Sequence, residues 1–491
     1  MCDFYIKKEV YRQILIKYKV YTLIVCIISQ LFAMSESTTT PTTTPTTTPT
    51  TPPFDYLSTS TTSGWSDKSP TPIQNALSGN SVASLGLDST VVNDNPYLFN
   101  NCLDYGLPIT NQKSSGRCWL FATCNLIRMV GYTTLKEKYG KIANFELSQS
   151  YLYFWDKLER YHRSLRYYVQ ISKTTDTQKD RYLYQLYQDP LGDGGQWDMA
   201  KEIVKKYGVV PREVFPDSHH AKSSREMNKI LTRQLTSDFA TLESTDTDVL
   251  ESAITIMTNR VFKMLVGFLG QPPKKFTWTF KGGEDWIHTL RDITPTDFVD
   301  TLNFKPDDWV SVIHDPRREH PYNKYYSVKY LGNVYNRHVG WLNLDIARVN
   351  ELAKNSIDQK HPVWFGCDVG AEWDRTTGVQ HPGIVDATGV TGLTTCQDKE
   401  SRLKTFTSLP NHAMLITGYH QDDDKITRWK VENSWGKTSG TDGFLLMTKE
   451  WMDQYVFQIL VQKSLLNSDE KMALGETPYD IEPWDPLGTL A

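Results

Sequence analysis

The segment 111–119 reads NQKSSGRCW and places Gln112 six residues before Cys118. The apolar residues after Cys118 recur at spacings of three and four, which predicts a helix that begins near this cysteine. Unpaired backbone N–H groups and the positive end of the helix dipole favour a thiolate in the first helical turn. The segment therefore predicts a nucleophilic Cys118, with an oxyanion hole made by the Gln112 amide and the backbone N–H of Cys118.

A base for this nucleophile is predicted far along the chain. His412 opens the apolar run NHAMLITGY, and Asn433 lies within VENSWG. In this arrangement His412 accepts the proton of Cys118, the Asn433 carboxamide orients the imidazole ring, and Trp435 shields their hydrogen bond from water. These residues predict amide hydrolysis by a cysteine nucleophile.

Each of these residues also has an ordinary structural explanation when it is taken alone. Cys118 is then a small core residue, His412 a satisfied structural histidine and Asn433 a turn cap. Cys124 and Cys367 fit the core role better, because both lie inside apolar runs without a nearby oxyanion donor. All the residue types that a catalytic site needs occur together and in the expected order. This favours the catalytic interpretation over the structural one.

That order is the arrangement of papain-like cysteine proteases, and longer motifs resemble the bleomycin hydrolase branch. The motifs that carry the resemblance are NQKSSGRCW (111–119), FELSQSYLYFWDKLER (145–160), GDGGQWDM (192–199), HDPRREHPYNKYY (314–326), VWFGCDVG (363–370), NHAMLITGY (411–419), VENSWG (431–436) and WDPLGTLA (484–491). The similarity runs from about residue 93 to residue 491.

The resemblance implies an α+β, papain-like fold of two lobes with a helical insertion at about 225–330. Gln112 and Cys118 belong to the helical lobe, and His412 and Asn433 belong to the β lobe. The gap from Cys118 to His412 is 294 residues (412 − 118), against about 130–150 in papain-type proteases. The insertion and its flanks account for the excess.

The same resemblance implies a cysteine aminopeptidase that removes N-terminal amino acids from peptides and from bleomycin-like amides, without a metal or an organic cofactor. Gly194 and Gly195 would dock the extended substrate, although a tight turn and helix cap also explains them. A C-terminal arm (471–491), without helical or strand period, would enter the cleft and be anchored by Trp484. The carboxylate of Ala491 would there pair with the α-ammonium of the substrate. Relatives of this type form hexamers, so a homo-oligomer is expected.

Composition limits the other possibilities. The chain has 491 residues, a formal net charge of −4 and a pI near 6.3, so no specific nucleic-acid partner is predicted. The seven cysteines show no metal-site spacing. Secreted and lysosomal relatives of papain carry a disulfide cysteine three residues before the nucleophile, where this chain has Ser115. This departure predicts a reducing, cytoplasmic compartment.

The first 92 residues differ in composition from the rest. Residues 1–33 are basic and then apolar, which is typical of a secretory signal, a short membrane anchor or a leader from an upstream start codon. A membrane association is expected only if this run is retained. Residues 34–92 form a Thr/Pro/Ser-rich spacer that is expected to be disordered. The peptidase domain is predicted at 93–470.

Local patterns predict individual elements. Ser148 is the expected N-cap of a helix over 149–168, and a helix from Trp197 is expected to end at Gly208. Residues 225–269 are helix-periodic, and Phe276, Trp278 and Phe280 alternate as in a strand. Further strands are predicted at 363–367, 413–419, 428–432 and 443–447.

Two other functions compete with the aminopeptidase. One is a papain-like endopeptidase of a secretory or lysosomal compartment, which would need the cleft disulfide and a charged helical prodomain. The other is a catalytically inactive scaffold on the same fold, which has no reason to keep Gln112, Cys118, His412 and Asn433 together.

Overall fold

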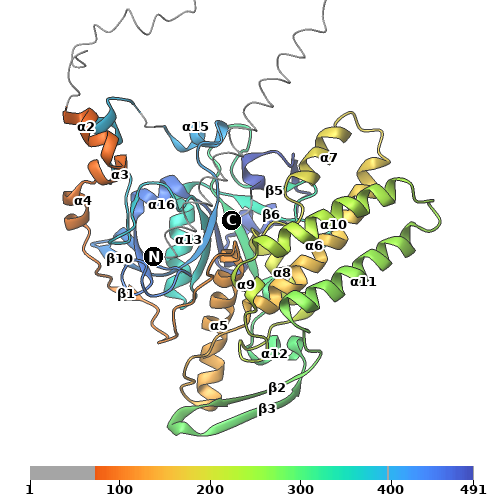
Figure 1. Cartoon of the computed structure of the whole chain (residues 1–491). Helices are drawn as coiled ribbons and strands as arrows, with labels where there is room; N and C mark the ends of the chain where they lie inside the picture. The colour runs from red at the N-terminus through yellow and green to blue at the C-terminus, as the bar shows by residue number, and fades with distance from the viewer. Residues whose placement is uncertain (1–71, 395–396, 490–491) are drawn as a thin grey trace, which may run out of the picture. The chain divides into compact units, whose positions relative to one another are not determined.

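The computed structural model of the chain describes residues 72–394 and 397–489. Leu490, Ala491, Cys396 and the whole of 1–71, with the leader and most of the spacer, lie outside the described residues. The fold combines a helical half with a large mixed sheet (Figure 1). This is the α+β class expected from the sequence.

Four helices of ten or more residues form the helical half near the predicted nucleophile. They are α5 (Cys118–Tyr139), α6 (Gln149–Ser172), α7 (Lys179–Gln188) and α8 (Trp197–Tyr207). The Ser148 hydroxyl accepts the backbone N–H of Tyr151 at 3.0 Å, which confirms the predicted N-cap of α6. Helix α8 ends where Gly208 adopts a φ of 73°, as the sequence predicts.

The sheet has twelve strands and mixes parallel and antiparallel pairs. Its order is β14-β5-β6-β4-β13-β7-β10-β11-β12-β9-β8, with β1 paired to β10. The strands are β1 (Asn101–Cys102), β4 (Trp309–Ile313), β5 (Lys324–Val328), β6 (Gly340–Asn343), β7 (Val363–Cys367), β8 (Trp373–Asp374), β9 (Val379–Gln380), β10 (His412–Asp422), β11 (Lys425–Glu432), β12 (Phe444–Thr448), β13 (Val456–Gln462) and β14 (Tyr479–Ile481). The four strands predicted from 363 onward are β7, β10, β11 and β12.

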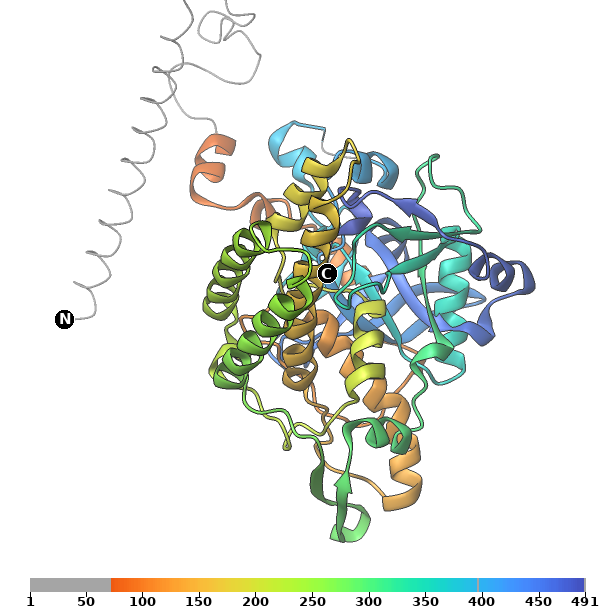
Figure 2. The ribbon, with the colours of Figure 1, turned by 90° about the vertical axis from the view of Figure 1, so that its right-hand side faces the viewer.

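The two faces of the sheet pack into different cores, because successive side chains of a strand point to opposite faces. Along β10, Ala413 and Leu415 join the core that contains α5 and α6. Met414 and Ile416 join the second core, together with α13 (Ile346–Asp358) and α16 (Lys449–Tyr455). Figure 2 shows the helical layer on one side of the sheet. The start of β10 therefore lies at the junction between the sheet and the N-terminus of α5.

The range 225–330 is helical only in its first part. Helices α10 (Arg225–Glu243) and α11 (Leu250–Leu269) extend from the helical half beside α6, preceded by the short α9 (His219–Lys222). A hairpin of β2 (Phe276–Lys281) and β3 (Ile287–Ile293) follows, then α12 (Pro295–Thr301) and the sheet strands β4 and β5 (Figure 1). The hairpin forms because Phe276, Trp278 and Phe280 bury one face, as their alternation predicts.

The C-terminal segment is more regular than its sequence predicts. It contains α17 (Ser468–Leu474), β14, which pairs in parallel with β5, and a 3₁₀ turn η4 (Pro486–Gly488). The expectation that 471–491 has no helix or strand was wrong, because elements of three to seven residues are too short to show a period. The expected anchoring by Trp484 is confirmed: its ring stacks on Tyr182 at 5.4 Å and lies 3.7 Å from the Arg181 guanidinium.

The boundary of the folded region also lies earlier than predicted. Residues 72–92, which were expected to belong to the disordered spacer, lie in α2 (Pro72–Gly79), α3 (Val82–Leu85) and the start of α4 (Ser89–Asp94). Side-chain caps start the last two helices: Ser81 accepts the N–H of Ser84, and Asp88 accepts the N–H of Thr90. Local capping thus organises a polar stretch whose composition alone predicted no structure.

Candidate active site

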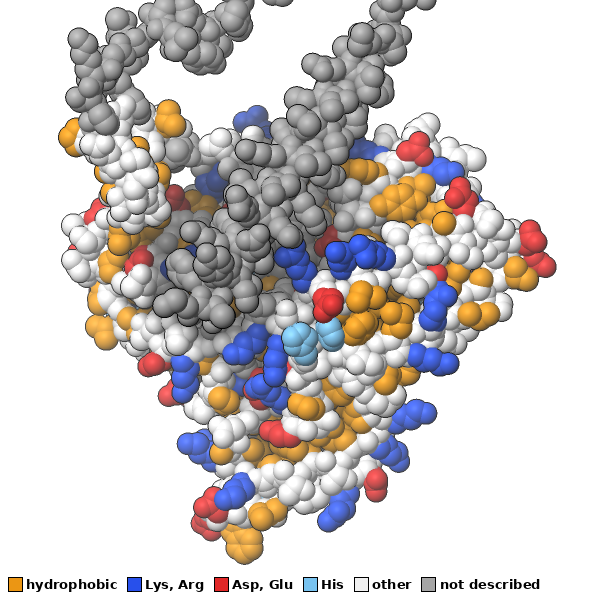
Figure 3. Space-filling view, viewed as in Figure 1, with side chains coloured by type: hydrophobic (Ala, Val, Ile, Leu, Met, Phe, Trp, Pro, Cys, Tyr) orange, Lys and Arg blue, Asp and Glu red, His pale blue; other side chains and the backbone are white. Residues whose placement is uncertain are grey.

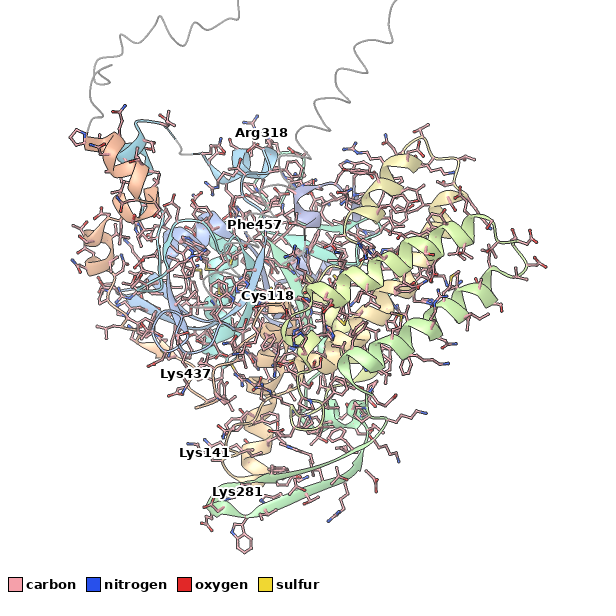
Figure 4. The ribbon with its side chains drawn as sticks, viewed as in Figure 1. Cys118, Lys141, Lys281, Arg318, Lys437 and Phe457 are labelled. Carbon is pink, nitrogen blue, oxygen red and sulfur yellow. The ribbon has the colours of Figure 1, made fainter. Side chains whose placement is uncertain are left out.

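The predicted nucleophile, base and orienting residue meet where α5 abuts the sheet. Cys118 is the first residue of α5 and is 3% exposed; Figure 4 shows it at this junction. His412 is the first residue of β10, and Asn433 directly follows β11. The antiparallel pairing of β10 with β11 brings the last two residues to the same end of the hairpin. The backbone N–H of Ala413 donates to the Cys118 sulfur, which places that sulfur beside the start of β10.

The hydrogen bonds around Asn433 determine which imidazole nitrogen carries a proton. Asn433 Oδ1 accepts the backbone N–H of Ser434 at 2.7 Å, so the amide oxygen faces this way. The same oxygen lies 2.9 Å from His412 Nε2, which must therefore be the donor. His412 Nδ1 is left with its lone pair. The Trp435 ring lies 4.7 Å from the imidazole ring, in the predicted shielding position.

The Gln112 side chain is held between the two lobes. Its Nε2 donates to the Ser115 carbonyl at 2.7 Å, and its Oε1 accepts the Ser434 hydroxyl at 2.7 Å. The Ser115 hydroxyl donates back to the Gln112 carbonyl at 2.7 Å. One N–H of Nε2 remains for a substrate oxygen. The serine that replaces the disulfide cysteine of secreted relatives thus closes this loop through hydrogen bonds.

Burial dominates the electrostatics of the pair. It raises the pKa of the Cys118 thiol to about 11, although the N–H groups of Ala413, Trp119 and Cys118 act in the opposite direction. Burial also lowers the pKa of His412 to about 4, against the effect of its hydrogen bond to Asn433. Burial of Cys118 and His412 thus opposes the thiolate that the helix start was expected to favour, and it favours the neutral form of each group taken alone.

A residue that the sequence reasoning missed, Asp193, ties the nucleophile loop to the helical lobe. Its carboxylate accepts the Gly116 N–H at 3.1 Å and the Tyr153 hydroxyl at 2.6 Å, and pairs with Lys157 at 2.8 Å. Its backbone carbonyl accepts the Trp119 indole N–H at 2.7 Å. Although burial opposes the charge, the Lys157 ammonium and the hydrogen-bond donors hold the pKa of this carboxyl well below its ordinary value. The sequence feature that could have pointed to Asp193 is an acidic residue inside a glycine-rich turn.

Gly194 and Gly195 directly follow Asp193 in the chain. A side chain at Gly195 would meet the Trp119 ring, because an ideal Cβ there lies 2.5 Å from it. The Gly194 carbonyl accepts a hydrogen bond from Arg160. Gly195 therefore has a packing role, which explains its residue type independently of any substrate contact.

The C-terminal segment reaches the same region. Gln196, which follows the glycine pair, donates to the Thr489 carbonyl at 2.9 Å. The Thr489 hydroxyl donates to the carbonyl of Pro410 at 3.3 Å, two residues before His412. The last described residue of the arm thus lies between the glycine pair and the start of β10. In the part of the chain that the structure describes, no group of three or more His, Cys, Asp or Glu side chains is placed to hold a metal ion.

Comparison with known proteins gives one consistent family. The model of the Peptidase C1-like family matches residues 56–488. The chain is 38% identical to aminopeptidase C of Lactobacillus delbrueckii subsp. lactis over 78% of its length and 86% of that protein. It is 36% identical to bleomycin hydrolase of Gallus gallus, over 85% of this chain and 94% of that one. The crystal structure of PepW from Lactobacillus rhamnosis HN001 matches with a TM-score of 0.80 and 33% identity, covering 85% of this chain and 94% of that chain.

Proposed function

Because this chain belongs to the Peptidase C1-like family and is a cysteine aminopeptidase, we propose that Cys118 is its nucleophile, His412 its base and Asn433 the residue that orients the base. The observation that carries the proposal is the 2.9 Å hydrogen bond between His412 Nε2 and Asn433 Oδ1, at the strand ends beside the first turn of α5. It leaves His412 Nδ1 free to take a proton.

The reaction begins with an uncharged pair. As Cys118 Sγ attacks the carbonyl carbon of the substrate, its proton moves to His412 Nδ1. Burial opposes each charge alone, but the thiolate and imidazolium form together and attract each other strongly in a site that excludes water. The bond to Asn433 stabilises the imidazolium and keeps its Nδ1–H directed at the reacting atoms.

The tetrahedral oxyanion is stabilised by two donors that are in place before the reaction. These are the remaining N–H of Gln112 Nε2 and the backbone N–H of Cys118. His412 then protonates the leaving amine, which departs and leaves an acyl-enzyme on Cys118. In the second half, His412 removes a proton from water, the hydroxide attacks the acyl carbon, and the thiol is released with the carboxylic acid product.

The assignment is tested with point variants and an aminoacyl-coumarin substrate. Cys118→Ala is expected to abolish turnover with an unchanged circular dichroism spectrum. Asn433→Ala is expected to retain part of the activity, because it removes only the group that orients the ring. Cys102→Ala is the matched control, since this thiol is exposed on β1. Full activity in the Cys118 variant would disprove the assignment.

The C-terminal arm is proposed to make the enzyme an aminopeptidase. Gln196 and Pro410 hold Thr489, the last described residue of the arm, beside the site. A terminal carboxylate at Ala491 would pair with the α-ammonium of the substrate and block longer N-terminal extensions. Gly194 and Gly195 are proposed to dock the substrate backbone. Substrates are then peptides with a free N-terminus, and bleomycin-like amides.

The role of the arm is tested by comparing one peptide in free and N-acetylated form. Deletion of residues 487–491 is expected to weaken hydrolysis of the free peptide and to allow cleavage of the acetylated one. Deletion of Ala491 alone should lower affinity for the free amine while most of the arm still blocks the cleft. An unchanged preference for the free amine after both deletions would show that the arm does not set specificity.

A homo-oligomer, a hexamer by family resemblance, is proposed to form through the helical insertion. Helix α11 is long and apolar enough to cross a membrane by length and composition alone, yet only part of it is buried in this chain. Ile256 on α11 is 63% exposed, and Val249 just before it is 47% exposed. Figure 3 shows hydrophobic side chains on this side of the molecule. Light scattering of Ile256→Glu beside the wild type tests this, and an unchanged mass would contradict it.

A reducing, cytoplasmic location is proposed from the cysteines. Ser115 replaces the disulfide partner, and Cys102, Cys118, Cys124 and Cys367 are all free in the described structure. Cell fractionation and intact-mass analysis of the protein from its native cell would test this and would show whether residues 1–33 are retained. A glycosylated extracellular form would contradict the proposal.

A further inference from the structure

A second pocket lies behind the C-terminal arm. It has a volume of about 300 Å³ and is formed by α6, α7, the loop after β5 and the segment 483–489. Its polar wall includes Arg160, Arg163, Tyr182, Asp189, Lys329 and Tyr330. Its opposite wall includes Pro483, Gly488 and Thr489. None of Gln112, Cys118, His412 and Asn433 lines it, whereas Gly194 does, so the pocket adjoins the substrate region without containing the catalytic groups.

Two of the three cations that line this pocket are neutralised by carboxylates. Arg160 pairs with the buried Asp156 at 2.8 Å. Lys329 pairs with Glu482, on the arm itself, at 2.6 Å. These ion pairs leave Arg163 as the lining cation without a paired carboxylate, opposite in charge to Asp189.

Arg163 is a buried cation that forms no ion pair in the described structure, and the nearby Asp156 acts on it only from beyond contact distance. Arg163 is 9% exposed, and no carboxylate lies within ion-pair distance of it among residues 72–394 and 397–489. One of its terminal nitrogens donates to the Tyr330 carbonyl, and its guanidinium lies 5.0 Å from the Tyr167 ring. Its Nε is buried without a hydrogen-bond partner. Burial lowers the pKa of this group to about 10, which still leaves it charged near pH 7.

An unpaired buried guanidinium is costly, and its planar fork of donors matches a carboxylate or an oxyanion. Asp189 is the acidic residue that lines the pocket in the described structure, and it forms no ion pair with Arg163. Its negative charge opposes any anion there, and opposes a polyanion most, while the small volume limits the ligand to a compact group. The apolar part of the wall, from Leu186 and Leu331, excludes competing water from such a ligand.

We propose that Arg163 binds a small carboxylate or inorganic oxyanion in this pocket, and that the bound anion holds the C-terminal arm in its place beside the active site. The second part rests on the proposed role of the arm. Because Gly488 and Thr489 also line the pocket, an anion that fills it packs against the same segment that Gln196 and Pro410 hold.

The binding test does not depend on activity. Isothermal titration and thermal unfolding of the full-length protein are followed with sodium acetate and sodium phosphate as separate probes. A saturable rise in Tm with either anion is expected, and the better of the two identifies the ligand as planar or tetrahedral. Arg163→Gln should weaken that affinity by at least about tenfold, because it removes charge-assisted hydrogen bonds. If this variant does not fold, Arg163→Lys keeps the charge but loses the fork, and should also bind more weakly.

Arg166→Gln, one turn along the same helix, controls for ionic strength, because Arg166 pairs with the exposed Glu251 instead of lining the pocket. It should bind both anions as the wild type does. Equal binding by the wild type and both Arg163 variants, or no saturable effect in the wild type, would overturn the site. The effect on the arm is read from the low residual hydrolysis of N-acetylated peptide, which saturating anion should suppress further in the wild type and not in Arg163→Gln. Anion binding without that suppression would refute the coupling alone.

Discussion

Replacing Asp193 tests whether this carboxylate organises the nucleophile loop. Asp193 is paired with Lys157 at 2.8 Å, with side chains that are 12% and 0% exposed. Asp193→Ala leaves the Lys157 ammonium buried with only the carbonyls of Leu191 and Gly192, at 2.5 and 2.8 Å. Removal of one partner of a buried ion pair costs about 3–5 kcal/mol. This loss of unfolding free energy is several times larger than that of most surface substitutions.

The charge rather than the shape of Asp193 is expected to cause most of this loss. Because its pKa lies well below the ordinary value of an aspartate, its stabilising contribution is complete above the unfolded pKa, near 4, and is lost only in stronger acid. The destabilisation of Asp193→Ala should therefore be constant from about pH 5 to 8. The double variant Asp193→Asn with Lys157→Met removes both charges and should recover most of the stability.

Activity should fall with stability, for a geometric reason. The Asp193 carboxylate holds the N–H of Gly116, two residues before Cys118. The bond of the Trp119 indole goes to the backbone carbonyl of Asp193 and is kept in Asp193→Ala. A displacement of about 1 Å at the reacting atoms costs roughly 100-fold in rate. We expect kcat/KM of Asp193→Ala to drop by about that factor at a temperature where the variant is still folded.

The assay combines urea unfolding, followed by tryptophan fluorescence, with turnover of the aminoacyl-coumarin substrate. Asp307→Ala is the control, because Asp307 pairs with Lys205 on the surface, where both side chains are 41% exposed or more. That change should cost less than about 1 kcal/mol. An Asp193→Ala protein with the unfolding midpoint and kcat/KM of the wild type would refute the reasoning.

Three further outcomes follow from the same geometry. Gly195→Ala should destabilise by about 1–3 kcal/mol and lower kcat/KM, measured by urea unfolding and turnover, because its Cβ would lie 2.5 Å from the Trp119 ring; wild-type values would contradict the packing role. The folded-state pKa of His412 is about 4, below its ordinary 6.5, so its stabilising effect is complete above about pH 6.5 and is lost as the pH falls through 4. The free energy of unfolding of the wild type should therefore fall by up to about 3 kcal/mol more between pH 7 and pH 4 than that of His412→Gln. An equal pH dependence of unfolding in the two proteins would contradict this. Asp485→Asn breaks the 2.9 Å ion pair of the arm with Arg317 and should raise hydrolysis of N-acetylated peptide; no increase would mean that the other contacts of the arm suffice.

Much of the catalytic lobe is readable from local patterns. The Ser148 cap, the end of α8 at Gly208 and the four strands from 363 onward depend on side chains near one another in sequence, and all are found where predicted. Short elements were not predicted from local patterns. Helix α17 starts with a capping box between Asn467 and Glu470, but seven residues are too few to show a period, and β14 is defined only by its partner β5.

The sequence by itself determined the residue types of the candidate site, because chemistry requires them: a thiol at a helix start, a histidine, an amide to orient it and an amide beside the thiol. Only the tertiary structure decided their electrostatic state. Burial depends on every element packed around Cys118 and His412, and it outweighs the helix-start donors that the sequence reveals. The same holds for Asp193 and Arg163. Both are ordinary charged residues in the sequence. Only the packing of distant segments gives Asp193 a buried ion pair and leaves the Nε of Arg163 without a hydrogen-bond partner.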